Sequence, residues 1–214
     1  MPSDFKLPRF YPVLDTGFLA ARVIAVPVAA EALLDAGVKI LQYRHKAAWT
    51  NVHFNEAKLI AGLCSQAGVL FVLNDRADFA AILGCALHIG QNDLPPVAAR
   101  KIVPDVAIGF STHNGFQLEK GDAEPVQYLS LGPIFSTTSK ANPDPVIRVS
   151  GLQALRPLTQ KPICAIGGIT LATAREVLDA GADSVAIISG LVHRSRARPE
   201  LRQLAEEWLS VVGG

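Results

Sequence analysis

The stretch LNDRADFAAILGCALHIGQND, residues 73–93, decides the fold. Two apolar strands, 69–73 and 86–89, flank a short helical pattern in this part of the chain. A polar loop follows each strand, with Asp75 after the first strand and Asp93 after the second. Parallel strands that are joined by one helix end on the same side of their sheet. We therefore expect both aspartates at one rim, close enough to share a cation.

The same alternation of strand and helix recurs along the whole chain. Predicted strands lie at 10–14, 38–43, 69–73, 86–89, 105–110, 126–131, 162–166 and 184–188. Predicted helices lie at 27–36, 51–66, 77–83, 95–102, 114–120, 150–158, 170–180 and 199–211, whereas residues 15–26 fit neither pattern. Eight such units in 214 residues favour an α/β fold, a TIM (β/α)8 barrel that forms one domain over 1–214. An open doubly wound sheet is the alternative. It would usually carry a Gly-rich turn after its first strand, where this chain has only Asp15-Thr16-Gly17.

Composition excludes several classes of protein. Half of the residues are hydrophobic and 18% are charged, which is typical of a folded chain with a large core. The net charge of +1 gives no reason to expect nucleic acid or a membrane as a partner. The sequence has no signal-peptide pattern and no run of about 18 apolar residues. Cys64, Cys85 and Cys164 lie in apolar runs without metal-binding spacing, so we expect them to be core residues of a protein in a reducing compartment, the cytoplasm. The sequence does not set the oligomeric state, and a homo-oligomer is one possibility.

Three polar side chains alternate at the end of the second predicted strand. Gln42, Arg44 and Lys46 are spaced by two residues, which places them on one face of the strand. At a barrel rim that face points inward, where buried cations require an anion. A solvated loop is the alternative reading of such a pattern. The two aspartates expected at the same rim favour an anion site.

The acidic residues have two readings. Asn74-Asp75 and Asp93 each stand where a helix N-cap is common. Two carboxylates after adjacent strands, completed by phosphate oxygens and water, are also how proteins hold Mg²⁺. The sequence has no Walker motif and no His/Cys cluster for zinc. We therefore expect a magnesium site at Asp75 and Asp93.

The histidines carry less weight in this interpretation. His88 lies in an apolar strand and is expected to be a hydrogen-bonded core residue. His113 follows the fifth predicted strand, within reach of the rim. His45, His53 and His193 have the surroundings of surface residues. No Ser/His/Asp arrangement or nucleophile elbow emerges.

Three loops offer groups for a phosphate. Residues 132–140, GPIFSTTSK, bring Thr137, Ser139 and Lys140, in a loop long enough to act as a lid. Glycines follow the seventh and eighth predicted strands, in AIGGI at 165–169 and IISG at 187–190. In barrels these last two loops commonly bind phosphate through backbone N–H groups. Flexible loops and ordinary turns are the alternative. Two anion sites at one rim would suit two anionic substrates, one of them a metal-bound diphosphate.

An ordered set of motifs resembles the thiamine-phosphate synthase family over about residues 10–190. The motifs are QYRHK at 42–46, NDR at 74–76, HIGQNDLP at 88–95, IGFSTHN at 108–114, GPIFSTTSK at 132–140, AIGGIT at 165–170 and AIISG at 186–190. The resemblance implies a TIM barrel and a transferase of thiamine biosynthesis that requires Mg²⁺. It implies that 4-amino-2-methyl-5-hydroxymethylpyrimidine diphosphate is joined to 4-methyl-5-(2-phosphoethyl)thiazole, with release of pyrophosphate and thiamine phosphate.

The resemblance also assigns roles to residues of this chain. The expected contacts of the pyrimidine diphosphate are Gln42, Arg44, Lys46, Asn74, Ser111 and Lys140. Those of the thiazole phosphate are Thr137, Ser139, Gly168, Ile188 and Ser189. Asp75 and Asp93 are expected to bind Mg²⁺. The catalytic set, which would stabilise the departing diphosphate, is Arg44, Lys46, Ser111 and Lys140.

Other functions remain as alternatives. A thiazole tautomerase is an isomerase on the same barrel, but that group has a histidine where this chain has Pro133, and it lacks the full metal pair. A non-catalytic sensor of phosphate ligands would be expected to have lost some of the charged rim residues, all of which are present. An isomerase of another pathway would need a clear general base at the rim, which the sequence does not offer.

Overall fold

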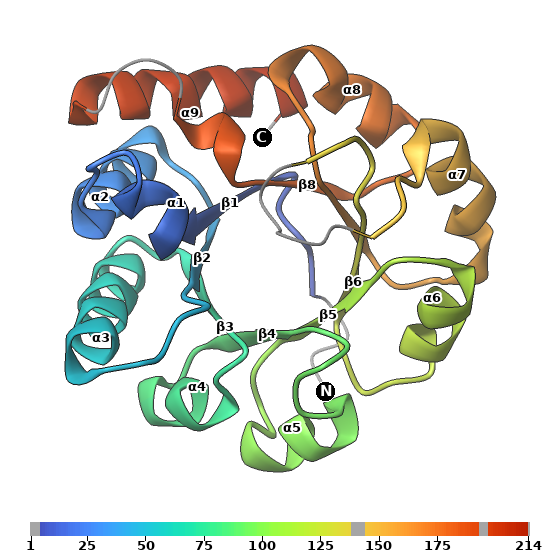
Figure 1. The fold of residues 1–214 in the computed structure, drawn as a ribbon, viewed down its shortest axis with the longest axis horizontal. Coiled ribbons are helices and arrows are strands. Elements are labelled where there is room, and N and C mark those ends of the chain that lie inside the picture. Colours follow the sequence, from blue (N-terminus) through green and yellow to red (C-terminus); the bar gives the residue numbers. More distant parts are fainter. Residues whose placement is uncertain (1–4, 138–143, 193–196, 214) are drawn as a thin grey trace.

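Eight parallel strands close into a barrel in the computed structural model, which describes residues 5–137, 144–192 and 197–213. Each strand pairs with the next along the chain, and the first pairs with the eighth (Figure 1). The strands are β1 Phe10–Asp15, β2 Ile40–Arg44, β3 Leu70–Asn74, β4 Ala86–Ile89, β5 Ile108–Thr112, β6 Tyr128–Leu131, β7 Ile163–Ile166 and β8 Ser184–Ile187. The TIM barrel predicted from the sequence is confirmed, and the open sheet is excluded.

Helices surround the barrel on its outside (Figure 1). They are α1 Thr16–Ala20, α2 Val26–Ala36, α3 Asn51–Gln66, α4 Ala77–Leu83, α5 Pro96–Ile102, α6 Gly115–Asp122, α7 Arg148–Leu155, α8 Leu171–Asp179 and α9 Arg198–Val212, with short 3-10 turns η1 Arg156–Leu158 and η2 Ser189–Leu191. Within the described ranges, none of these helices has the length and apolar character needed to cross a bilayer.

Two apolar layers hold the barrel together. The larger lies between strands and helices, where outward-facing strand residues pack on the apolar faces of the helices. The smaller fills the barrel interior with inward-facing residues, among them Tyr11, Ile40, Val72 and Tyr128. Strands that are covered on both faces read as continuous apolar runs, as the sequence pattern indicated. Cys64, Cys85 and Cys164 are buried free thiols, which confirms their interpretation as core residues.

Several elements differ by a few residues from the predicted boundaries, and among the strands the largest difference is at β5. β5 begins at Ile108 and not at Asp105, because the guanidinium of Arg100 donates to the carbonyls of Val103, Pro104 and Val106 at 3.0, 3.1 and 2.7 Å. Those carbonyls are thereby withheld from the sheet, and the strand extends instead through Ser111 to Thr112.

The short helix α1 was not predicted. It spans five residues, too few to show a helical period, and it begins where the Asp15 carboxylate accepts a hydrogen bond from the backbone N–H of Phe18 at 2.8 Å.

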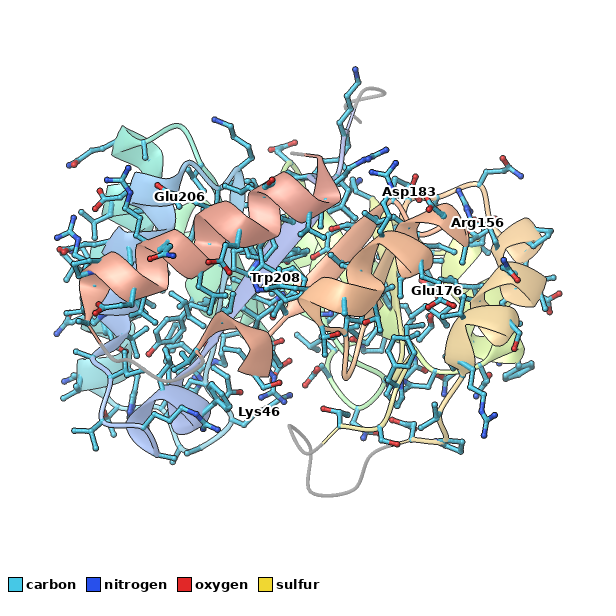
Figure 2. All side chains as sticks on the ribbon, turned by 90° about the horizontal axis from the view of Figure 1, so that it is seen from above. Lys46, Arg156, Glu176, Asp183, Glu206 and Trp208 are labelled. Carbon is cyan, nitrogen blue, oxygen red and sulfur yellow. The ribbon has the colours of Figure 1, made fainter. Side chains whose placement is uncertain are left out.

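The two ends of the barrel carry different groups. Figure 2 shows Lys46 toward one end, and Arg156 and Asp183 toward the other. Arg156 and Asp183 precede β7 and β8 and pair at 3.6 Å, so they mark the end where strands begin. Lys46 follows β2 and marks the end where strands finish, which in barrels of this class is the end that binds ligands.

Candidate active site

One cavity of about 590 Å³ opens at the end of the barrel where the strands finish. Its lining includes every predicted site residue that the structure describes: Gln42, Arg44, Lys46, Asn74, Asp75, Asp93, Ser111, Thr137, Gly168, Ile188 and Ser189. Ser139 and Lys140 lie outside the described residues. Residues that are scattered over about 150 positions of sequence thus face a single space, because successive parallel strands finish at the same rim.

The two aspartates meet in this cavity. The backbone N–H of Asp75 donates to the carbonyl of His88 at 2.8 Å, which fixes the end of β3 beside β4. A carboxylate oxygen of Asp93 accepts from the backbone N–H of Gly90 at 2.7 Å. The carboxyl group of Asp93 lies near enough to that of Asp75 to affect its pKa. Burial raises the pKa of Asp75 to about 6; the ammonium of Lys46 opposes that rise, and the neighbouring Asp93 adds to it.

Neither carboxylate caps a described helix. The N-cap of α4 is Arg76 and the N-cap of α5 is Pro95, and neither helix receives a side-chain cap. The alternative reading of Asp75 and Asp93 as caps is therefore wrong. No third His, Cys, Asp or Glu joins them to form a metal-binding group in the described part of the chain. A pair of carboxylates without nitrogen or sulfur donors fits a hard divalent cation that takes its remaining oxygens from a ligand and water.

The cations of β2 are already paired with carboxylates. The guanidinium of Arg44 forms an ion pair with Asp15, a residue that the sequence interpretation had left unassigned. The ammonium of Lys46 lies 2.5 Å from a carboxylate oxygen of Asp75 and is half exposed. Both cations face the cavity, in the alternation that the sequence predicted. Each of these two cations therefore has a carboxylate partner, whereas Asp93 accepts from a backbone N–H.

Tyr11 and His88 line the cavity and Tyr128 bonds to both, although none of these three aromatic side chains was in the predicted set of site residues. Tyr11 and Tyr128 face each other across the barrel with their hydroxyl oxygens 2.7 Å apart, and His88 lies 3.0 Å from the Tyr128 hydroxyl. Gly109 is the one sequence signal that bears on this group. A Cβ there would lie 2.0 Å from Cζ of Tyr128, so only glycine leaves space for the tyrosine ring.

Asn74 presents an unpaired donor to the cavity. Its side chain is 4% exposed, and its amide nitrogen Nδ2 finds no hydrogen-bond partner among the described residues. A buried amide donor without a partner is costly, and native proteins usually satisfy it. An acceptor atom of a bound ligand would satisfy this one.

The far side of the cavity is formed by the loops after β6, β7 and β8. Phe135 donates its backbone N–H to the carbonyl of Gly167 at 2.9 Å, which joins the first two loops. Gly168 has a φ of +64°, and a Cβ there would lie 2.4 Å from the Ser136 carbonyl oxygen. Only glycine permits this close approach of the two loops. Thr137 and Ser189 line the cavity from the same side.

The histidines lie partly where the sequence predicted and partly elsewhere. His88 is buried and hydrogen-bonded, as predicted, and it also lines the cavity, as does His113. His45 was expected at the surface, and that prediction is wrong. Its ring is 8% exposed, accepts or donates a hydrogen bond at 2.7 Å with Thr16 of α1, and stacks on His53 with ring centres 3.8 Å apart. Thr16 of the unpredicted helix α1 and the ring of His53 thus both contact His45. His193 lies outside the described residues.

Comparison with known proteins agrees with the geometry. The family model described as thiamine monophosphate synthase matches residues 10–191. The thiamine-phosphate synthase of Koribacter versatilis is 42% identical over 216 residues, covering 99% of each chain. That of Chloroflexus aurantiacus is 36% identical over 197 residues, covering 92% of this chain and 90% of the relative. Among solved structures, thiamine phosphate pyrophosphorylase from Pyrococcus furiosus superposes with a TM-score of 0.82 at 27% identity, covering 96% and 95% of the two chains.

These matches extend over the whole barrel and include each strand end that contributes to the cavity. They confirm the resemblance found in the sequence motifs, and with it the prediction of an enzyme of thiamine biosynthesis. The chain belongs to the thiamine monophosphate synthase family.

Proposed function

We propose that this protein is a thiamine-phosphate synthase. It joins 4-amino-2-methyl-5-hydroxymethylpyrimidine diphosphate to 4-methyl-5-(2-phosphoethyl)thiazole and releases pyrophosphate and thiamine phosphate. The observation that carries the proposal is the meeting of Asp75 and Asp93 beside Lys46 and Arg44, in one cavity with the glycine loops after β7 and β8. That arrangement provides one place for a metal diphosphate and another for a second phosphate.

Members of this family need a divalent metal ion, and we propose Mg²⁺ held by Asp75 and Asp93. The donor set supports this choice, because Mg²⁺ prefers one or two carboxylates together with substrate phosphate oxygens and water. When bound, Mg²⁺ would neutralise negative charge on the diphosphate. Burial, together with the neighbouring Asp93, raises the pKa of Asp75, and a divalent cation would supply positive charge that favours the ionised form of both carboxylates.

Side chains in and just after β2, together with Ser111 of β5, act on the leaving group. The guanidinium of Arg44 and the ammonium of Lys46 attract the diphosphate oxygens, as does Lys140 of the loop after β6 in this proposal. The hydroxyl of Ser111 lines the same space. Stabilisation of negative charge at these positions lets the bond between the methylene carbon and the diphosphate oxygen break. The diphosphate then departs with the electron pair and leaves the pyrimidine methylene as a resonance-stabilised cation, which the thiazole nitrogen captures.

No protein nucleophile is required in this scheme. Burial raises the pKa of Cys164, the thiol that lines the cavity, to about 12, so it remains neutral. The protein's main contribution is to hold two substrates in line and exclude water. Gln42 and the unpaired amide of Asn74 face the pyrimidine diphosphate, while Thr137, Ser139, Gly168, Ile188 and Ser189 hold the thiazole phosphate.

The test is direct. Purified protein is mixed with both substrates and Mg²⁺, and thiamine phosphate is measured by its conversion to fluorescent thiochrome, with pyrophosphate measured in parallel. We expect equal amounts of both products, and neither when the thiazole phosphate or the metal is omitted. Absence of thiamine phosphate with substrates that a relative converts would overturn the proposal.

We place the reaction in the cytoplasm, since the three cysteines are free and buried.

A further inference from the structure

A continuous chain of hydrogen bonds crosses the base of the cavity. It runs through five side chains from five strands: Gln42, Tyr11, Tyr128, His88 and Ser111. The successive donor–acceptor distances are 2.9, 2.7, 3.0 and 2.9 Å. The first four side chains are each at most 8% exposed, whereas Ser111 lies at the cavity surface.

Gln42, the first member, determines which group donates in each bond of this hydrogen-bond chain. The atom of Gln42 that faces Tyr11 is the amide nitrogen Nε2, which can only donate. Tyr11 therefore accepts that bond and has one proton left to give. If Tyr11 did not give it to Tyr128, a hydroxyl proton would remain unpaired in the fully buried interior, which is unfavourable.

The same reasoning fixes the next two bonds. Tyr128 accepts from Tyr11 and gives its own proton to Nδ1 of His88. An Nδ1 that accepts must be unprotonated, so in the neutral ring the proton stands on Nε2. Nε2 then donates to Oγ of Ser111. The hydroxyl proton of Ser111 is left for a partner in the cavity.

Burial keeps the tyrosine hydroxyls in the state that this order requires. Desolvation raises the pKa of both Tyr11 and Tyr128 well above the ordinary value for tyrosine, so each stays neutral and carries its proton. The backbone of Ser111 is also fixed, because the side-chain amide of Gln91 donates to its carbonyl oxygen at 2.6 Å. The bond from Nε2 of His88 then occupies one lone pair of the Ser111 hydroxyl and directs its proton away from the histidine.

We propose that Tyr128 is a positioning residue that acts through His88 to aim the Ser111 hydroxyl proton into the cavity. On the function proposed above, the acceptor is an oxygen of the diphosphate leaving group. A hydroxyl aimed in this way stabilises negative charge as it develops. A chain that ran in the opposite direction would turn the lone pairs of Ser111 toward the same anion and oppose the reaction.

The direction of the hydrogen-bond chain can be tested by finding which ring nitrogen of His88 carries the proton. This measurement needs neither a ligand nor enzyme activity. Long-range ¹H–¹⁵N correlation spectra of protein labelled at histidine identify which ring nitrogen carries the proton, and loss of signals in His88→Gln assigns the residue. We expect the Nε2–H form in the wild type and a mixture of forms in Tyr128→Phe. Tyr43→Phe is the matched control. It removes a hydroxyl that bonds Glu56 at 2.8 Å outside the chain, and it should leave His88 unchanged. An Nδ1–H form in the wild type would overturn the proposal.

Kinetics of a double mutant then test whether Tyr128 acts through Ser111. Loss of one neutral hydrogen bond corresponds to about 1 kcal/mol, so Tyr128→Phe should lower kcat by about fivefold with KM changed less than about twofold. In Ser111→Ala the second substitution should have almost no further effect, because the group that it positions is gone. Effects that multiply in the double mutant would show independent roles and overturn the proposal. A wild-type protein that forms no thiamine phosphate would instead refute the proposed function, while the His88 spectrum would still decide the chain.

Discussion

The ammonium of Lys46 lies 2.5 Å from a carboxylate oxygen of Asp75, beside the point where the Asp75 and Asp93 carboxyl groups meet. A lysine thus supplies one positive charge to the acidic pair. Arg44 is paired in the same way with Asp15. A metal diphosphate would bring its own cation to the aspartates and its own anion to Lys46 and Arg44. Binding would therefore exchange the ion-pair partners of Lys46 and Arg44.

This exchange predicts opposite effects of one substitution. In Lys46→Met the ammonium no longer competes for Asp75, so the free protein should bind Mn²⁺ or Mg²⁺ more tightly. An exposed ion pair contributes about 0.2–1 kcal/mol, which sets a gain of up to roughly fivefold from lost competition alone. Turnover should fall, because the diphosphate loses a cation. Titration calorimetry of the free protein measures the first effect, and steady-state kinetics measures the second.

Lys58→Met is the matched control, since Lys58 is exposed on α3 and does not line the cavity. It should change neither metal affinity nor turnover. Weaker metal binding in Lys46→Met would contradict the idea that lysine and metal compete for Asp75.

Metal binding should also depend on pH through Asp75. Its pKa is raised to about 6, chiefly by burial, so the free protein holds a proton there that an unfolded aspartate loses near its ordinary value of 3.8. The folded state therefore binds more protons than the unfolded state between about pH 4 and pH 6, and its stability from this group decreases as the pH rises through that window. A metal ion must displace the proton, so affinity should fall about tenfold per unit below pH 6. Calorimetry in buffers of different ionisation enthalpy measures the proton release.

Asp75→Asn is the variant that isolates this effect. The backbone at Asp75 has a φ of +66°, which asparagine tolerates better than alanine does. The variant should keep its fold, lose most of its metal affinity and release no proton. Unchanged proton release in Asp75→Asn would assign the titration to another group.

The sequence was sufficient for the parts of the site that depend on local order. Asp75 and Asp93 follow consecutive strands, and the rule that parallel strands finish at one rim brings them together without further information. The alternation of Gln42, Arg44 and Lys46 follows from the strand period alone. Most of the fold could be predicted for the same reason, since each βα unit carries its own apolar pattern.

The remaining features depend on closure of the barrel. Tyr11 and Tyr128 lie 117 positions apart in sequence, and they meet only because β1 and β6 face each other across the interior. The local sequence around either tyrosine gives no signal that predicts its contact with the other. Asp15 was left unassigned because α1 is too short to show a period, and Thr16 of the same helix forms a hydrogen bond with His45. Contacts that form across the barrel or under an irregular segment leave no periodic signal in the sequence.

The three thiols should be unreactive in the native protein. Burial raises the pKa of Cys64, Cys85 and Cys164 to about 12 in each case, so almost none of the reactive thiolate is present at pH 8. We expect Ellman's reagent to label no thiol within minutes in native buffer and all three in guanidinium chloride. Because an unfolded cysteine ionises near 9, the stability from these groups should decrease as the pH rises above that value. Rapid labelling of one thiol in native buffer would show that its surroundings open to solvent.

A pair of glycine substitutions tests how the base of the cavity is built. In Gly109→Ala the new Cβ would lie 2.0 Å from Cζ of Tyr128, which the closed barrel cannot accommodate without moving the ring. Overpacking of this kind costs about 1–3 kcal/mol. Gly62→Ala is the control, because Gly62 lies within α3 and a Cβ there meets nothing within 4 Å. It should stabilise the protein by about 0.5–1 kcal/mol, since alanine loses less freedom in a helix than glycine does. Urea unfolding followed by circular dichroism compares the two. If Gly109→Ala were as stable as the wild type, the Tyr128 ring would have room to move, and the position of its hydroxyl between Tyr11 and His88 would not be set by β5.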